Sequence, residues 1–314
     1  MAQLVIRRLL ALIPMVFLVS LMVFALVLLI PGDPAITISG ENASAAQIQA
    51  TRERLGLDDP VLVQYGRWAG NAAQGDLGTS LFSSRSVSSA ISERFPVTLT
   101  LTVAALIVAL LIAIPAGVIA AMNRGTWIDR LATMGASAGV AMPSFWVGLV
   151  LIILFAIWNP WLPALGYVSL RDDPGDALKH LILPSITLGM AASAETTRQL
   201  RSALSDVLHQ DYIRTARAKG LRGRAVIVRH ALKNAAVPVI TVIGLQVSVL
   251  LGGSVITEQV FGIPGLGQLA ISAVLQRDIP MIQGIVVVTT IVVLVVNLLV
   301  DLSYGWLNPK VRAR

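Results

Sequence analysis

The sequence predicts an all-α membrane protein that crosses the bilayer several times. Of its 314 residues, 55% are hydrophobic and only 13% are charged, whereas soluble domains carry about 25% charged residues. Several uncharged stretches reach the ~20 residues that a helix needs to cross the hydrocarbon core. The chain contains no cysteine, and its three histidines lie far apart. Disulfides and thiolate chemistry are therefore excluded, and no metal site is expected.

Six membrane-spanning helices are expected, and the fourth gives the weakest signal. Its uncharged part, residues 181–194, has only 14 residues, which cover roughly 21 Å in a helix. We expect this helix to continue through Glu195 and Arg198 into the cytosol, and a re-entrant helix is the alternative. The expected spans are 9–30, 97–122, 131–157, 181–194, 234–257 and 279–300.

Lysine and arginine predict the orientation of these spans. Sixteen of the 24 basic residues lie in the N-terminus, the 123–130 loop, the 195–233 loop and the C-terminal tail. Cytosolic segments carry the excess of basic residues, so we expect both termini and the 195–233 loop in the cytosol. Topology thus accounts for most of the net charge of +7, and no nucleic-acid partner is indicated.

The domain organisation follows from this topology. Residues 1–30 are the cytosolic N-terminus and first span, since 22 uncharged residues exceed the apolar region of a signal peptide. Residues 31–94 are too short and polar for an independent domain, and they are expected to form a small extracytoplasmic cap between the first two spans. The second to sixth spans lie within residues 95–306, with a cytosolic loop at 195–233 and a tail at 307–314.

Local signals place short elements within the cap. Pro31-Gly-Asp-Pro34 is expected to stop the first helix, because proline lacks the N–H donor that a continuing helix needs. Residues 43–55 predict a helix capped by Asn42 or Ser44 and stopped by Gly56. An amphipathic piece is expected to run through Tyr65 and Trp68. The segments expected to form loops are 75–78 and 83–89.

The spans offer few groups for chemistry. No ionisable residue lies deep within an uninterrupted span, and the candidates near the ends are Glu195, Asp301 and His180. Ion-coupled carriers often need such a residue in the path, so a secondary carrier or a channel is the weaker alternative. A membrane-bound enzyme or scaffold has little support, since paired carboxylates and a nucleophile–base set are missing from the sequence.

The chain also lacks a nucleotide-binding loop. Gly220-Leu-Arg-Gly223 is followed by no Lys-Ser/Thr pair that would hold phosphate and Mg²⁺, so any ATPase would be a separate subunit. Pro143 predicts a bend in the third span, where a hydroxyl could line a pathway. The polar or aromatic candidates for such a pathway are Ser144, Trp146, Ser193, Gln246, Ser248 and Asn297.

The 195–233 loop predicts a docking element. Seven basic residues and no acidic residue lie between Arg214 and Lys233. Apolar residues from Leu200 onward follow a helical period, and Gly220 is suited to ending that helix. Small residues before the glycine would permit close approach to a partner, and basic ones would steer it. The alternative is that the loop is basic only because it is cytosolic.

Two stretches of this loop resemble the cytosolic coupling loop of ABC importer permeases, closest to the dipeptide/oligopeptide/nickel branch. They are Tyr212-Ile-Arg-Thr-Ala-Arg-Ala-Lys-Gly-Leu221 and Arg229-His-Ala-Leu-Lys-Asn-Ala-Ala236. Arg214 and Lys233 stand where the general permease motif has Glu and Pro. Further matching motifs are Pro31-Gly-Asp-Pro34, Leu55-Gly-Leu-Asp58, Gly75-Asp-Leu-Gly-Thr-Ser80, Met142-Pro-Ser-Phe-Trp146, Leu183-Pro184, Phe261-Gly-Ile-Pro-Gly-Leu-Gly267 and Asn297-Leu-Leu-Val-Asp301 with Tyr304.

The resemblance implies a type I ABC importer permease in a prokaryotic inner membrane. Such a subunit works with a second homologous permease, two ATP-binding subunits that hold ATP and Mg²⁺, and an extracytoplasmic substrate-binding protein. It binds no cofactor itself. Permeases of this branch serve peptides, nickel, haem, glutathione and some sugars, and di- or oligopeptides are expected here. The implied ATPase-coupling residues are Arg214, Thr215, Ala216, Arg217, Ala218, Lys219, Gly220 and Leu221.

Overall fold

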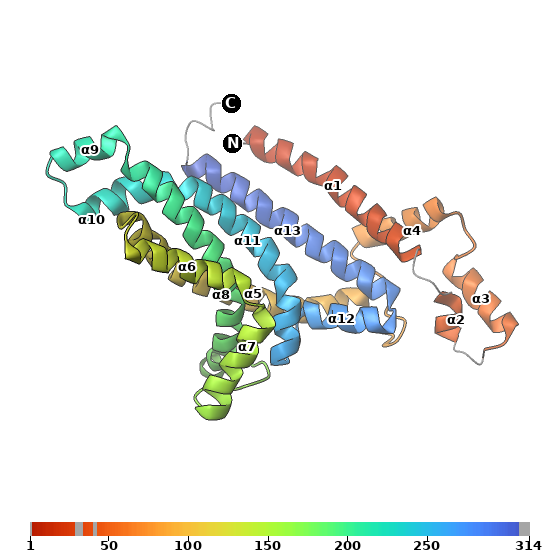
Figure 1. The fold of residues 1–314 in the computed structure, drawn as a ribbon. Helices are drawn as coiled ribbons and strands as arrows, with labels where there is room; N and C mark the ends of the chain where they lie inside the picture. The colour runs from red at the N-terminus through yellow and green to blue at the C-terminus, as the bar shows by residue number, and fades with distance from the viewer. Residues whose placement is uncertain (1, 29–33, 40–42, 308–314) are drawn as a thin grey trace. The chain divides into compact units, whose positions relative to one another are not determined.

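The computed structural model describes residues 2–28, 34–39 and 43–307, which form helices and connecting turns (Figure 1). Two compact units divide the chain. Unit 1 comprises Met1–Val5, Val97–Gly267 and Val295–Arg314, and unit 2 comprises Ile6–Pro96 and Gln268–Leu294. The expected stop at residues 31–33, the candidate cap Asn42 and the tail after Leu307 lie outside the described residues.

The described residues form α-helices and two π-helical segments. In chain order they are α1 (Ala2–Leu28), α2 (Pro34–Ser39), α3 (Ala45–Leu55), α4 (Val61–Ala73), α5 (Val87–Met122), α6 (Trp127–Ala141), α7 (Ser144–Ile152) with a π-helical continuation (Ile153–Trp158), α8 (Pro174–Leu208), α9 (Asp211–Ala218), α10 (Gly223–Ala225) with a π-helical continuation (Val226–Ala231), α11 (Leu232–Phe261), α12 (Leu266–Gln276) and α13 (Ile279–Leu307).

The apolar helices confirm a polytopic membrane protein, although their number differs from the expected six. Within the described residues, four helical runs are long and apolar enough to cross a bilayer: α5, α8, α10–α11 and α13. A fifth span results if the bent pair of α6 and α7 counts as one. The apolar part of α1, Leu12–Ala25, is shorter than the others.

The third expected span is not one straight helix. Its two halves meet at 98°, and the break lies at Met142 and Pro143. Proline disfavours helical geometry in the residue before it, and Met142 accordingly has ψ 127°. The expected bend at Pro143 is confirmed. The span expected over 131–157 thus consists of two helices, α6 and α7 with its π-helical continuation.

The fourth expected span continues as predicted. α8 is one helix of 35 residues from Pro174 to Leu208, so it passes through Glu195 and Arg198 without a break. Asp173 begins it, since its carboxylate accepts the backbone N–H groups of Gly175 and Asp176, a common N-cap arrangement. The length of α8 removes the re-entrant alternative.

The elements of the cap follow the expected pattern with one difference, and a further helix lies outside the cap. Ser44 caps α3 in a reciprocal capping box with Gln47, and Gly56 ends the helix with φ +63°. Residues 75–78 form a turn as expected. The helix of α5 already begins at Val87, so the expectation of loop through residue 89 was wrong. α12 is a helix that the sequence interpretation missed within segment 258–278.

Close helix packing in unit 1 depends on a glycine of α8. A Cβ atom at Gly189 would lie 2.6 Å from the carbonyl oxygen of Ala105 and 3.2 Å from Val108 Cβ, both on α5. A neighbouring core cluster contains Leu101, Leu183 and other buried apolar residues. Small residues permit such backbone approach in membranes, so Gly189 sets the spacing of α5 and α8.

An ion pair fixes α6 to α8. The guanidinium of Arg201 donates to both carboxylate oxygens of Asp129, with one N–O distance of 2.6 Å. Gly125 N–H donates to the same carboxylate at 2.9 Å, and Arg124 donates to Ser205 on α8 at 3.0 Å. Because the Asp129 side chain is only 5% exposed, these donors compensate a buried charge.

Substitution of Gly189 by alanine is expected to destabilise the protein. The new methyl group would overlap the α5 backbone, and overpacking of this kind costs about 1–3 kcal/mol. The apparent melting temperature of the full chain in detergent should fall. Gly252→Ala on α11 is the matched control, because nothing lies within 4 Å of its Cβ position. Equal melting temperatures for the two variants would contradict the role of Gly189.

Asp129→Asn should also lower the melting temperature. The variant removes the charge that the Arg201 guanidinium requires, and losing one partner of a buried polar interaction costs about 1–3 kcal/mol. Asp211→Asn serves as the control, since that side chain is 94% exposed in its pair with Arg214 and such surface changes stay within about 0.5 kcal/mol. A larger effect at Asp211 than at Asp129 would refute this assignment.

Candidate functional site

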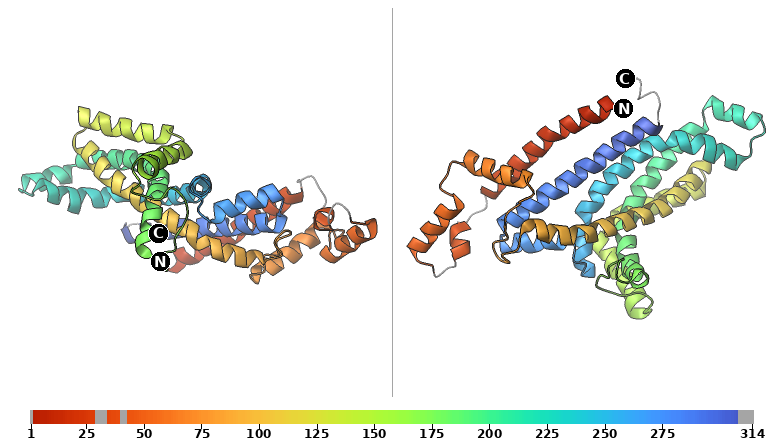
Figure 2. Two further views of the ribbon diagram at one scale, coloured as in Figure 1. Left: turned by 90° about the horizontal axis from the view of Figure 1, so that it is seen from below. Right: turned by 180° about the vertical axis from the view of Figure 1, so that it is seen from behind.

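The short helix α9 lies at the end of α8 and α11 in every view (Figures 1 and 2). His209 and Gln210 separate it from α8, so the expectation of one helix running from Leu200 past residue 213 was wrong. Instead, α9 is a separate helix of eight residues. One face of α9 packs against the rest of the chain, and the opposite face is exposed.

The inner face of α9 is part of the core of unit 1. Ile213 is fully buried and Ala216 is 8% exposed. Both belong to a cluster of buried apolar residues contributed by the end of α5, by α8 and by the helical run that leads into α11. The members of this cluster, called here the α9 base, are Ala121, Leu200, Leu204, Ile213, Ala216, Val226, Ala231, Ala235 and Val239.

A hydrogen bond supplements this apolar contact. The side-chain amide of Asn234 donates to the hydroxyl of Tyr212 at 3.0 Å and to the carbonyl of His230 at 2.7 Å. Tyr212 is on α9, and Asn234 lies in the first turn of α11. This bond connects α9 to α11, and the α9 base connects it to α8.

The outer face of α9 carries the other predicted coupling residues. All of them except Ala216 are exposed. Ala216 instead packs in the α9 base, so internal packing explains its small size. The exposed members are Arg214, Thr215, Arg217, Ala218, Lys219, Gly220 and Leu221. Arg214 and Arg217 on α9, with Lys219 directly after it, make this face strongly basic.

Gly220 ends α9 in the way that its position in the sequence predicts. It has φ +77°, a left-handed conformation that glycine adopts without a steric penalty. The N–H of Gly220 donates to the carbonyl of Arg217 at 2.9 Å, and the N–H of Leu221 donates to that of Ala216 at 3.3 Å. This pair of bonds is a Schellman motif. It reverses the chain toward α10 and leaves Lys219 and Leu221 exposed.

The predicted pathway residues differ in how far they are exposed. Ser193 is 6% exposed, and its hydroxyl donates to the carbonyl of Met190 within α8 at 2.7 Å. Trp146 is 49% exposed on α7. No hydrogen bond links any two of the six candidates in the described part of the chain. The remaining four are partly buried, namely Ser144, Gln246, Ser248 and Asn297.

The sequence interpretation missed a buried carboxyl group at the other end of α11. Glu258 is fully buried, and its Oε1 atom accepts the hydroxyl of Thr98 at 2.7 Å. The backbone N–H of Leu266 in turn donates to Thr98 Oγ1 at 2.7 Å. Gly265 and Gly267 pack directly on the carboxyl group, leaving no room for a Cβ atom.

The glycine-rich motif therefore has a structural explanation. Residues 261–267 fold back over the last turn of α11, and they join Glu258 to Thr98 on α5. The signal in the sequence was an acidic residue one position after an expected span, followed by three glycines within six residues. Among the described residues, no group of three or more acidic, histidine or cysteine side chains is arranged to hold a metal ion.

Comparisons with known proteins agree with this architecture. The family model of the binding-protein-dependent transport system inner membrane component matches residues 113–313, and a model of the N-terminal part of this membrane component matches residues 1–102. The two matches together cover nearly all of the sequence.

Characterised relatives match over the full length. The glutathione transport system permease protein GsiC of Escherichia coli O6:H1 is 44% identical over 312 residues, covering 99% of each chain. GsiC of Escherichia coli K12 and of Shigella boydii serotype 4 are each 43% identical with the same coverage.

A solved structure shares the fold. The inward-facing MetNI methionine ABC transporter matches with a TM-score of 0.58 and 17% identity, covering 70% of this chain and 96% of that chain. At this identity the likeness concerns the fold alone. The sequence matches are stronger, because they extend over the whole chain at more than 40% identity. The chain belongs to the family of binding-protein-dependent transport system inner membrane components, the permease subunits of ABC importers.

Proposed function

We propose that this permease imports di- or oligopeptides, with small peptides such as glutathione as the first substrates to test. The support for this substrate class is the full-length similarity to GsiC, a permease of glutathione transport systems. The chain forms half of the translocation pathway, and a second homologous permease forms the other half. An extracytoplasmic binding protein delivers the substrate, and two ATPase subunits supply ATP and Mg²⁺.

The α9 helix couples the pathway to the ATPase subunits. The observation that carries this proposal is the difference between its faces: Ile213 and Ala216 are buried in the α9 base, while the opposite face is exposed and basic. A helix buried on one face moves together with α8 and α11. The exposed residues between Arg214 and Leu221, which exclude Ala216, remain available to a groove in the ATPase, where basic side chains provide steering.

This function requires a definite orientation. Both termini and the 195–233 loop face the cytosol, and residues 31–94 form the extracytoplasmic cap. The excess of basic residues in the cytosolic segments supports this arrangement. The permease core extends over residues 95–306, with the tail 307–314 in the cytosol.

Charge reversal on α9 should uncouple the transporter. The double variant Arg217→Glu/Lys219→Glu places two acidic groups on the exposed face while leaving the α9 base intact. We expect ATPase activity stimulated by the binding protein to fall at least about tenfold, equivalent to about 1.4 kcal/mol. The ATPase subunits should also co-purify in reduced amounts. Both quantities are measured on the assembled complex in nanodiscs.

The matched control is Arg171→Glu/Lys179→Glu, which changes the net charge equally at two exposed positions of segment 158–180. It should retain normal co-purification of the ATPase subunits. Co-purification and stimulated activity that stay normal in the α9 variant would rule out the docking role. Uptake of glutathione and of longer peptides by proteoliposomes then tests the substrate class separately.

A further inference from the structure

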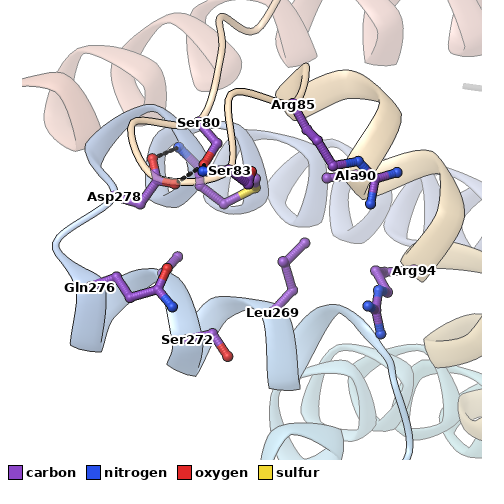
Figure 3. A pocket seen from close by; sticks show the side chains of 11 residues that line it. Ser80, Ser83, Arg85, Ala90, Arg94, Leu269, Ser272, Gln276 and Asp278 are labelled. Atoms are coloured by element: carbon purple, nitrogen blue, oxygen red, sulfur yellow. Dashed lines mark hydrogen bonds between the residues drawn. The ribbon is translucent and has the colours of Figure 1, made fainter. Parts of the chain in front are cut away.

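Unit 2 contains a pocket of about 220 Å³. Its walls come from the loop before α5, the first turns of α5, the helix α12 and the start of α13 (Figure 3). Figure 3 shows Arg85 and Arg94 on one side and Asp278 and Gln276 on the opposite side. The loop before α5 and its first turns, with Arg85 and Arg94, belong to the segment 31–94 for which we propose an extracytoplasmic location.

The carboxylate of Asp278, on one wall of the pocket, already accepts hydrogen bonds from other residues of the chain. Asp278 is 2% exposed, and its carboxylate accepts the hydroxyl of Ser80 at 2.5 Å. The backbone N–H groups of Leu81 and Met281 also donate to it, at 3.3 and 3.4 Å. Asp278 therefore holds the loop before α5 against the start of α13, and its role is to shape the pocket.

The two arginines on the opposite wall have N–H donors that make no hydrogen bond with the described residues. Arg85 donates to Glu93 at 2.8 Å, and both of these side chains are more than half exposed. Arg94 is partly buried and lines the pocket. The hydrogen bond from Arg85 lowers the pKa of Glu93, and the charge of Arg94 adds a smaller effect in the same direction, but the Arg94 side chain makes no hydrogen bond or ion pair with any described residue. A guanidinium has five N–H donors, and shielding it from water without an acceptor is unfavourable.

The chemistry and the size of the pocket together define its ligand. A carboxylate matches the planar fork of an arginine and can accept two N–H bonds from it. The pocket is smaller than the roughly 300–1,000 Å³ of typical small-molecule sites. It can therefore hold a single side chain more readily than a whole peptide substrate. Ser83 and Gln276 line the same space and offer further polar contacts.

We propose that this pocket receives an aspartate or glutamate side chain of the extracytoplasmic binding protein, with Arg94 as its principal partner. The proposal rests on the proposed function, because it requires a binding protein on this side of the membrane. Docking through a partly buried arginine fixes the register of the two proteins. An acidic residue inserted beside Arg94 also contacts α12 and the start of α13, both of which line the pocket.

The test measures the dissociation constant of the binding protein for the assembled transporter in nanodiscs, with and without Arg94→Gln. We expect at least about tenfold weaker binding for this variant and unchanged ATPase activity in the absence of the binding protein. Arg94→Lys keeps the charge but loses the two-donor fork, so it should bind more weakly than the wild type and more tightly than Arg94→Gln. Arg67→Gln is the control, because Arg67 pairs with Asp59 outside the pocket.

Each outcome decides the proposal. An unchanged dissociation constant for Arg94→Gln would overturn the proposal, whether transport is normal or reduced. Reduced transport with unchanged binding of the binding protein would indicate that Arg94 contacts a carboxylate of the substrate instead. An equal loss for Arg67→Gln would also overturn it, since the effect would then be general electrostatics. If the wild-type complex itself bound no binding protein and showed no stimulated ATPase activity, the proposed function would fail instead.

Discussion

The apolar contact beneath α9 is the constraint on which the proposed coupling depends. An isolated helix of eight residues is not stable in water, so α9 owes its structure to the burial of Ile213 and Ala216 against α8 and the run into α11. The same contact makes the helix rigid relative to two membrane spans. A force applied to its exposed basic face is therefore transmitted to α8 and α11, whereas a flexible basic loop would absorb it.

Within unit 1, the two ends of α11 are built on different principles. Near α9 the packing is apolar and is supplemented by the Tyr212–Asn234 hydrogen bond. At the opposite end, the buried carboxyl group of Glu258 accepts a hydrogen bond from Thr98, and the glycine-rich turn packs against it. Buried polar groups require defined partners, so this end has one specific arrangement. The long helix thus connects α9, for which we propose the coupling role, to the buried Glu258 and its partners.

The sequence predicted the features that depend on local chemistry. Pro143 was correctly associated with a bend, Gly220 with a helix end and Ser44 with a cap, because each residue type favours one backbone geometry. Tertiary features were missed: the burial of Ala216, the Asp129–Arg201 pair and the Glu258–Thr98 hydrogen bond all join positions far apart in the chain. The residues that line a pathway could not be predicted. In the sequence, a hydroxyl that faces a pathway looks the same as one that bonds to a carbonyl of its own helix.

The central claim is that the exposed face of α9 contacts an ATPase subunit. The chain has no cysteine, so a single cysteine at Thr215 can carry a photoactivatable cross-linker without background from other positions. In the assembled complex, we expect a cross-link from Thr215→Cys to the ATPase subunit and none from Arg171→Cys, which lies in segment 158–180. Absence of this product from Thr215→Cys, or an equal yield from Arg171→Cys, would contradict the account.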